Sequence, residues 1–301
     1  MNSKDVTAKP GTLRRIAAVL FGLGLAAAVA VTVFAVVRAP VIYQTDSAFG
    51  HIFVTENRRG VRSLYFGEGK ARQGAAVPGR PTHLEVAYMR VATVGLALPA
   101  KVDRVLFVGL GVGAMPMYTR AKWPEAHIDV VEIDPVVVDV AEHYFGFARD
   151  GRMEVHVEDG RTFIESGAGP SYDLIVLDAY SDEGVPRHLT THEFLSAVRA
   201  RLAPNGIVVS NLWGSSSVYG SMLATFEEAF GDLAVVRAGG VQRIVVVSNG
   251  GGPLDEEGMV EAASKLARRF SLGFDLPRLI RAGYVQAPRS IGPVLVDGGN
   301  G

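Results

Sequence analysis

Apolar and polar positions alternate along the middle of the chain in the manner of an α/β protein. Short apolar runs, of the length of buried strands, are followed by longer segments in which apolar residues recur at helical spacing. The predicted strands are 104–108, 128–131, 153–157, 172–177 and 207–211. The predicted helices lie just after Gly113, at 135–145, from 161 onward, at 191–202 and at 219–230. Repeated strand–helix units predict a doubly wound, mostly parallel sheet.

This sheet is expected to end in an antiparallel hairpin. Residues 233–237 and 242–248 are apolar and rich in β-branched residues, with Gly239 and Gly240 between them. Adjacent glycines favour a tight turn between two strands. A reversed last strand is typical of S-adenosylmethionine-dependent transferases, whereas nicotinamide-binding sheets are usually all parallel. The predicted fold class is therefore the S-adenosylmethionine-dependent transferase type.

The regions on either side of the sheet have other patterns. Residues 41–66 alternate around a turn and predict a β-hairpin, the start of a small β subdomain. Residues 67–81 are rich in Gly, Pro and small residues and predict a loop, and 83–98 predict a helix. After the sheet, an amphipathic helix is expected at 256–270, followed by a polar tail.

One apolar segment near the N-terminus is long enough to cross a bilayer. Residues 16–37 contain Thr32 as their only polar member, and about 20 apolar residues span the hydrocarbon region as a helix. The segment is longer than the apolar part of a signal peptide, so we expect a single-pass membrane anchor at 16–38. Lys and Arg residues precede it, so the positive-inside rule places the N-terminus in the cytoplasm and the globular part on the other side of the membrane. A cofactor that is a cytoplasmic metabolite would instead require the globular part to lie in the cytoplasm. The side of the membrane is left open.

The predicted organisation follows from these patterns. It comprises an N-terminal segment at 1–15, a transmembrane helix at 16–38, the β subdomain with its connecting helix at 41–98, a Rossmann-like nucleoside-binding domain at 99–248, and a C-terminal helix and tail at 249–301.

Composition excludes several kinds of function. The formal net charge of the 301 residues is −1, and no basic stripe is present, so we expect no nucleic-acid partner. The chain has no cysteine, which excludes disulfides, thiolate metal sites and cysteine nucleophiles. His51, His188 and His192 are scattered along the sequence, and no metal site is expected from them.

The segment 104–135 carries the clearest candidate site. A predicted strand runs into Gly109, Gly111 and Gly113, and the next strand ends at Glu132. Glycines at a strand–helix turn let the backbone approach a ligand closely, and a carboxylate about 20 residues further on suits a ribose diol. Ile133, which follows Glu132, is included in this cofactor site.

Two further acids follow predicted strands. Asp159 precedes Gly160 and can accept a hydrogen bond from an adenine amino group, although it can equally cap the next helix. Asp178 ends the fourth strand and leads into a loop with Asp182 and Glu183. Carboxylates gathered at one sheet edge favour cations, and one of them can act as a general base toward an amine.

With these residues in view, the chain resembles the spermidine synthase family of polyamine aminopropyltransferases, especially its membrane-associated or permease-fused members. The similarity covers roughly 43–211. The matching segments are VLFVGLGVGA, similar to the glycine loop, VVEIDP, similar to the ribose-binding strand end, VEDGRTF, similar to the adenine-contacting segment, and DAYSDEGVPRHLTTHEFL, similar to the catalytic loop.

The resemblance implies a role for each matching residue. Asp178 would activate the amine, Glu132 would bind the ribose, and Asp159 with Gly160 would contact the adenine. Gln73 would lie near the cofactor, and Tyr88 and Asp182 would contact the substrate. The co-substrate implied is decarboxylated S-adenosylmethionine, or S-adenosylmethionine itself, and the acceptor is a polyamine such as putrescine.

The chain departs from the family where the amine would bind. The family's glycine-loop aspartate, which holds the aminopropyl ammonium, is replaced by Val112, and its Tyr-His-Glu run by Tyr88, Met89 and Arg90. A methyltransferase using S-adenosylmethionine therefore remains an alternative, because Arg90 could meet the carboxylate of that co-substrate. A non-catalytic adenosyl-nucleoside binder is a further alternative. For the oligomeric state, we consider a homodimer.

Overall fold

The computed structural model describes residues 39–299 with the exception of 68–70, 168, 182–183 and 287–290. Residues 41–301 form one compact unit. The expected transmembrane helix at 16–38 lies outside the described residues, as does Asp182. Within the described part of the chain, no helix is both long enough and apolar enough to span a membrane.

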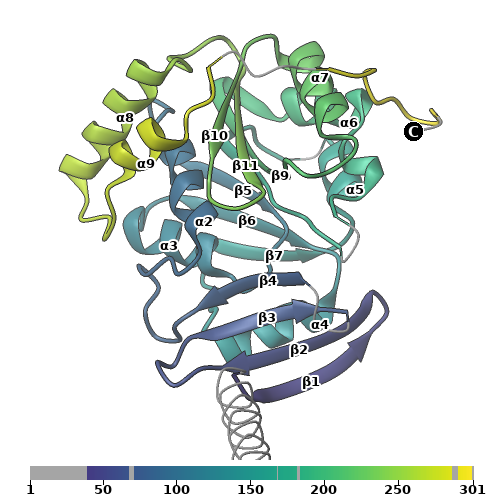
Figure 1. Ribbon diagram of the computed structural model, residues 1–301, viewed down its shortest axis with the longest axis vertical. Coiled ribbons are helices and arrows are strands. Elements are labelled where there is room, and N and C mark those ends of the chain that lie inside the picture. The colour runs from purple at the N-terminus through teal and green to yellow at the C-terminus, as the bar shows by residue number, and fades with distance from the viewer. Residues whose placement is uncertain (1–38, 68–70, 168, 182–183, 287–290, 300–301) are drawn as a thin grey trace, which may run out of the picture. The chain divides into compact units, whose positions relative to one another are not determined.

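A four-stranded antiparallel sheet forms the N-terminal part of this unit (Figure 1). Its strands are, in chain order, β1 Val41–Ser47, β2 Gly50–Glu56, β3 Arg62–Phe66 and β4 Ala71–Ala76. The predicted hairpin is confirmed as β2 and β3, in which Ile52 pairs with Phe66 and Glu56 with Arg62.

The expected loop at 67–81 is wrong in part, because it contains β4. Its sequence, ARQGAA, has neither β-branched residues nor alternation, so local propensity gives no strand signal. Pairing with β3 nevertheless makes this segment a strand. Tertiary context overrides a weak local preference here.

The larger sheet has seven strands in the order β10-β11-β9-β8-β5-β6-β7. The strands are β5 Arg104–Val108, β6 His127–Glu132, β7 Met153–Val157, β8 Tyr172–Leu177, β9 Leu202–Trp213, β10 Leu233–Arg237 and β11 Gln242–Ser248. β5 to β9 are mutually parallel, and β11 runs antiparallel to both β9 and β10. The predicted mostly parallel sheet with a terminal antiparallel hairpin is therefore confirmed.

Helices cover both faces of this sheet (Figure 1). Successive residues of a strand point to opposite faces, and accordingly Val105 and Phe107 lie in one hydrophobic cluster whereas Leu106 and Val108 lie in another. The helices packed into the first cluster are α2 Ala87–Ala92, α3 Ala114–Lys122, α4 Pro135–Val140, α8 Glu256–Arg269 and α9 Leu276–Gly283. Those packed into the second are α5 Gly160–Glu165, α6 His192–Ala200 and α7 Tyr219–Phe230.

The helix expected at 83–98 is shorter than predicted. It comprises α2 and a 3₁₀ turn at Thr93–Leu96. The Arg90 side chain donates hydrogen bonds to the backbone carbonyls of Leu84 and Glu85. These bonds hold 84–85 in a non-helical conformation before the helix begins.

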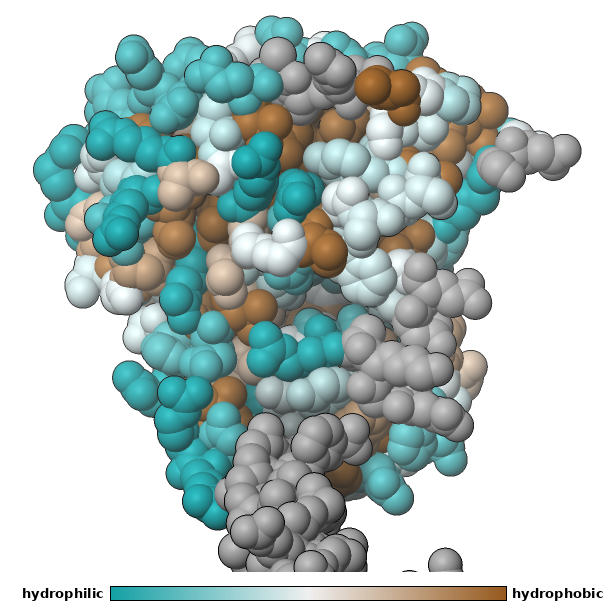
Figure 2. Space-filling model, in the orientation of Figure 1, coloured by the Kyte–Doolittle hydropathy of each residue, from teal (hydrophilic) through white to brown (hydrophobic). Residues whose placement is uncertain are grey.

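The C-terminal part is more ordered than a polar tail. The amphipathic helix is confirmed as α8. The molecular surface at the position of α8 is mostly hydrophilic (Figure 2). The expected polar tail is wrong, because α9 follows, with Leu276 and Ile280 fully buried. Leu279 also packs against the core, so three apolar residues recur at helical spacing in a segment that otherwise contains two arginines.

We predict that Ile280→Ala lowers the free energy of unfolding by about 2 to 5 kcal/mol, because it leaves a cavity in a fully packed position. Arg278→Ala, an exposed change on the same helix, should shift it by no more than about 0.5 kcal/mol. Chemical denaturation of both variants measures the difference. Equal stabilities would mean that α9 contributes nothing to the core.

Candidate active site

A cavity of about 370 Å³ lies at the carboxyl ends of the parallel strands. Its wall includes residues of the small sheet, of α2 and of the larger sheet. Open α/β sheets bind ligands at this edge. The sequence-predicted site residues that line it are Gln73, Tyr88, Gly109, Gly111, Glu132, Ile133, Asp159, Gly160 and Asp178.

The glycine loop adopts backbone conformations that favour glycine. Gly109, Gly111 and Gly113 have φ values of 99°, 53° and 71°. A Cβ atom on Gly109 would overlap the carbonyl oxygen of Asp178, and one on Gly113 would lie 2.7 Å from the Phe147 ring. Gly111 faces open space. Two of the glycines therefore allow close packing of the loop, and Gly111 leaves room at the cavity wall.

Glu132 ties the glycine loop to the end of β6. Its Oε2 accepts a hydrogen bond from the Leu110 backbone N–H at 3.0 Å, and its Oε1 accepts one from that of Asp134 at 3.1 Å. Burial raises the pKa of this carboxyl, while the backbone N–H groups oppose the rise. The carboxylate is thus held in a fixed orientation, and its remaining lone pairs can accept from a ligand diol.

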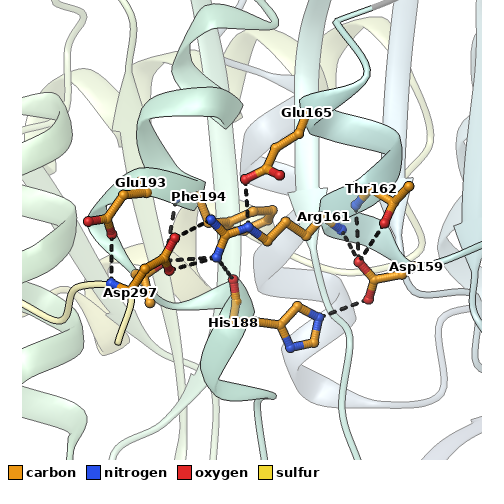
Figure 3. Close-up of polar contacts among 9 residues, drawn as sticks. Asp159, Arg161, Thr162, Glu165, His188, Glu193, Phe194 and Asp297 are labelled. Atoms are coloured by element: carbon orange, nitrogen blue, oxygen red, sulfur yellow. Dashed lines mark hydrogen bonds and ion pairs between the residues drawn. The ribbon is translucent and has the colours of Figure 1, made fainter. Parts of the chain in front are cut away.

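Asp159 caps α5 and also borders the cavity. Its Oδ1 accepts from the backbone N–H groups of Arg161 and Thr162, both at 3.0 Å. Its Oδ2 lies 2.8 Å from His188 Nε2 (Figure 3). Burial acts to raise the pKa of Asp159, but the Thr162 N–H and His188 outweigh it and the pKa is lowered. Helix capping and ligand contact, both considered from the sequence, are compatible in this position.

The same end of the cavity is tied to the C-terminal segment. Arg161 makes a two-point contact with Asp297 and a further hydrogen bond to Glu165 at 2.6 Å (Figure 3). The Asp297 backbone N–H in turn donates to Glu193 on α6. This network orders the start of α5, where Asp159 and Gly160 lie.

Asp178 lies at the other end of the cavity, between two donors. Its Oδ2 accepts from the Tyr88 hydroxyl at 2.9 Å, and its Oδ1 accepts from Asn211 Nδ2 at 3.0 Å. Burial raises the pKa of Asp178 to about 6, although both hydrogen bonds act to lower it. A carboxyl with this pKa is largely ionised at neutral pH and is a stronger base than an ordinary aspartate.

Gln73, in the cavity wall, has a side-chain donor that is unpaired among the described residues. Its Nε2 is buried and makes no hydrogen bond among the described residues. Buried polar groups are normally paired, so this donor is available to a ligand. The Asn211 Oδ1 atom is also buried without a hydrogen-bond partner among the described residues, so it is an acceptor available to a ligand.

Sequence reasoning missed several cavity residues at the end where Asp178 lies, which we call the amine end. Asn211, Tyr180, Trp213 and Arg72 all line the cavity. Asn211 could have been found by the rule that identified the acids, because the sequence places it at the end of a predicted parallel strand. Only carboxylates, and not amides, were considered as candidates. Tyr180 donates to the Asn211 carbonyl at 2.7 Å and its ring stacks on Trp213.

Arg90 was considered, within the methyltransferase alternative, as a partner for a co-substrate carboxylate, and the structure contradicts this role. Arg90 is absent from the cavity wall and bonds to backbone carbonyls instead. Val112 does line the cavity. It stands at the position where the family that the sequence resembles has an aspartate.

The raised pKa of Asp178 gives a prediction for stability. A carboxyl whose pKa is higher in the folded protein than in the unfolded chain stabilises the fold while protonated, and this contribution is lost as pH rises through about 6. Asp178→Asn removes the ionisation. The melting temperature of the variant relative to wild type should therefore rise between pH 5 and pH 8, as measured by calorimetry. Parallel pH profiles of the two proteins would contradict the assignment.

Comparison with known proteins supports one family. The spermine/spermidine synthase domain model matches residues 87–232. A polyamine aminopropyltransferase of Vibrio vulnificus (strain CMCP6) is 34% identical over 207 residues, which are 66% of this chain and 68% of that protein.

Two solved structures bear on the fold. A spermidine synthase in complex with the transition-state analogue AdoDATO is 19% identical and superposes with a TM-score of 0.67 over 82% of this chain and 85% of that one. Human methyltransferase-like protein 13 in complex with SAH is 30% identical, with a TM-score of 0.54 over 65% of this chain and 92% of that one. The mixed, mostly parallel sheet is thus shared with proteins that hold adenosyl compounds.

Together with the cavity at the strand ends, the similarity to the Vibrio vulnificus protein over most of its length shows that this chain belongs to the spermine/spermidine synthase family and is a transferase.

Proposed function

We propose that the protein transfers an aminopropyl group from decarboxylated S-adenosylmethionine to an amine of the polyamine class, such as putrescine. The observation that carries this proposal is Asp178, a carboxyl with a raised pKa in the wall of the same cavity as Glu132 and the glycine loop. A nucleoside binder without chemistry would not need a base in that position.

The nucleoside half of the donor fits the end of the cavity formed by the larger sheet. Glu132 accepts from the ribose hydroxyls, and Asp159 accepts from the adenine amino group through lone pairs not used in capping. Both carboxylates are already oriented by backbone N–H groups. Fixed acceptors lose little freedom on binding, which favours affinity.

Asp178 then supplies the base for the transfer. The nitrogen of the acceptor amine forms a bond to the propyl carbon attached to the sulfonium, the carbon–sulfur bond breaks, and methylthioadenosine leaves with the electron pair. The proton lost from the amine passes to Asp178. The Tyr88 and Asn211 hydrogen bonds hold the carboxylate in place for this step.

Methyl transfer from S-adenosylmethionine is the second candidate. It is favoured by Val112, which puts an apolar side chain where the family's acid would hold the donor ammonium. The similarity to a methyltransferase-like protein solved with SAH also favours it. The product would then be S-adenosylhomocysteine rather than methylthioadenosine.

Two substitutions separate binding from chemistry. Asp178→Asn should lower the rate of methylthioadenosine release by about 10²-fold or more while leaving methylthioadenosine affinity nearly unchanged, because it removes only the base. Glu132→Gln should weaken that affinity by about 10-fold or more, because an orienting charged acceptor is lost. Product assays and calorimetry on the full chain measure both. An Asp178 variant that keeps its rate but loses affinity would contradict the base assignment.

We also propose that residues 16–38 anchor the protein to a membrane. The length of the apolar run supports this. The full chain expressed in cells should remain in the membrane fraction after alkaline carbonate washing. Release into the supernatant would contradict the proposal.

A further inference from the structure

An irregularity in β4 brings two neighbouring side chains to the cavity. In the pairing of β3 with β4, Leu64 lies opposite Gly74 and Tyr65 opposite Arg72, so Gln73 is an extra residue at a bulge. In a regular strand, adjacent side chains point to opposite faces. A bulge re-aims them, and both Arg72 and Gln73 line the cavity.

Arg72 lies near the reactive end of the cavity. Gly74, two residues further along β4, packs so closely on Val112 that an added Cβ would lie 3.0 Å from both Val112 methyl groups. The Arg72 guanidinium also acts on Tyr88: burial and Asp178 raise the pKa of that hydroxyl, and the positive charge opposes them. Arg72 therefore lies in the cavity wall, close enough to the Tyr88–Asp178 pair for its charge to act on the Tyr88 hydroxyl.

The charge of Arg72 is not neutralised within the described part of the chain. Its side chain makes no hydrogen bond or ion pair among those residues and is exposed at the cavity wall. The other arginine close in sequence to the site, Arg90, is bonded to backbone carbonyls. Arg72 thus presents to a ligand a guanidinium that no described residue binds.

The described acids of the cavity are mostly engaged elsewhere. Glu132 and Asp159 hold backbone N–H groups at the nucleoside end, and Asp134 caps α4. At the amine end, Asp178 is the one described carboxylate that lines the cavity, and Arg72 is the one described Lys or Arg. A diamine would bring a second ammonium toward a guanidinium, which like-charge repulsion disfavours. A ligand with one amine and one carboxylate would satisfy both groups.

We propose that Arg72 binds a carboxylate, so that one of the two substrates is an amino carboxylate rather than a purely cationic amine. This rests on the adenosyl group transfer proposed for the cavity, which both candidate functions share, and it narrows the substrates: a carboxylate on the donor selects S-adenosylmethionine, and a carboxylate on the acceptor selects an amino acid in place of putrescine. The planar guanidinium matches a carboxylate with two parallel hydrogen bonds. The buried Gln73 Nε2, which lacks a partner among the described residues, is a further donor in the same wall. The carboxylate belongs either to the adenosyl donor or to the acceptor.

The first experiment tests the donor. Calorimetry on the full chain compares S-adenosylhomocysteine with its decarboxylated analogue, for wild type, Arg72→Gln and Arg59→Gln. Arg59 is an exposed arginine of the same small sheet, in the turn between β2 and β3 and outside the cavity wall. If the donor supplies the carboxylate, wild type and Arg59→Gln should bind the carboxylated ligand at least about 10-fold more tightly, the size of a charged hydrogen bond. Arg72→Gln should lose this preference.

The second experiment tests the acceptor. Release of methylthioadenosine from decarboxylated S-adenosylmethionine is compared with 4-aminobutyrate and with putrescine as acceptors. If the acceptor supplies the carboxylate, wild type and Arg59→Gln should have the higher kcat/KM for 4-aminobutyrate, and Arg72→Gln should not.

The outcomes separate this inference from the function on which it rests. Binding of methylthioadenosine to wild type with no preference for a carboxylate in either experiment would overturn the role of Arg72 and leave the proposed function intact. Equal behaviour of Arg72→Gln and Arg59→Gln would overturn it as well. Failure of methylthioadenosine to bind at all would remove the proposed function and this inference with it.

Discussion

The close approach of the Gly109 backbone to the carbonyl of Asp178 is the constraint on which the site depends. Any side chain at Gly109 would overlap that carbonyl, so β5 and β8 can place their ends together only with glycine there. The contact joins the glycine loop, which we propose receives a nucleoside, to Asp178, which we propose as the base. Glu132 fixes the other side of the same loop through the Leu110 N–H. In the proposed function, a donor bound at the glycine loop is therefore held beside Asp178.

The two ends of the cavity have different structural origins. The nucleoside end is built from consecutive strand–turn–helix units of the parallel sheet, where glycine φ values, helix caps and strand ends are local properties. The amine end combines α2, the ends of β8 and β9, and β4 of the separate antiparallel sheet. Specificity for the transferred group therefore depends on residues far apart in the sequence. This arrangement allows one end to change while the other is kept.

Most of the larger sheet could be predicted from the sequence. The strands at 104–108, 172–177 and 242–248 have the predicted bounds, because each contains an apolar run that is buried between helices in the interior of the sheet. Asp178 and Glu132 were found because parallel strands end at one edge. By contrast, β4 and α9 were missed. The segment of β4 carries little periodic signal and becomes a strand because β3 provides an edge to pair with. The segment of α9 does have apolar residues at helical spacing, Leu276, Leu279 and Ile280, but it was assigned to a polar tail.

Local periodicity and backbone freedom are enough to predict the strands and helices of the larger sheet, the glycine loop and the acids at the strand ends. Only the tertiary structure decided which side chains share the amine end. Arg90 is only two residues from Tyr88 in the sequence, but its side chain donates hydrogen bonds to the backbone carbonyls of Leu84 and Glu85. Arg72 reaches the cavity because of a bulge in a strand that pairing alone creates. Side-chain direction at a bulge depends on the register with the neighbouring strand, and β4 lacks the alternating apolar pattern from which that register could be read.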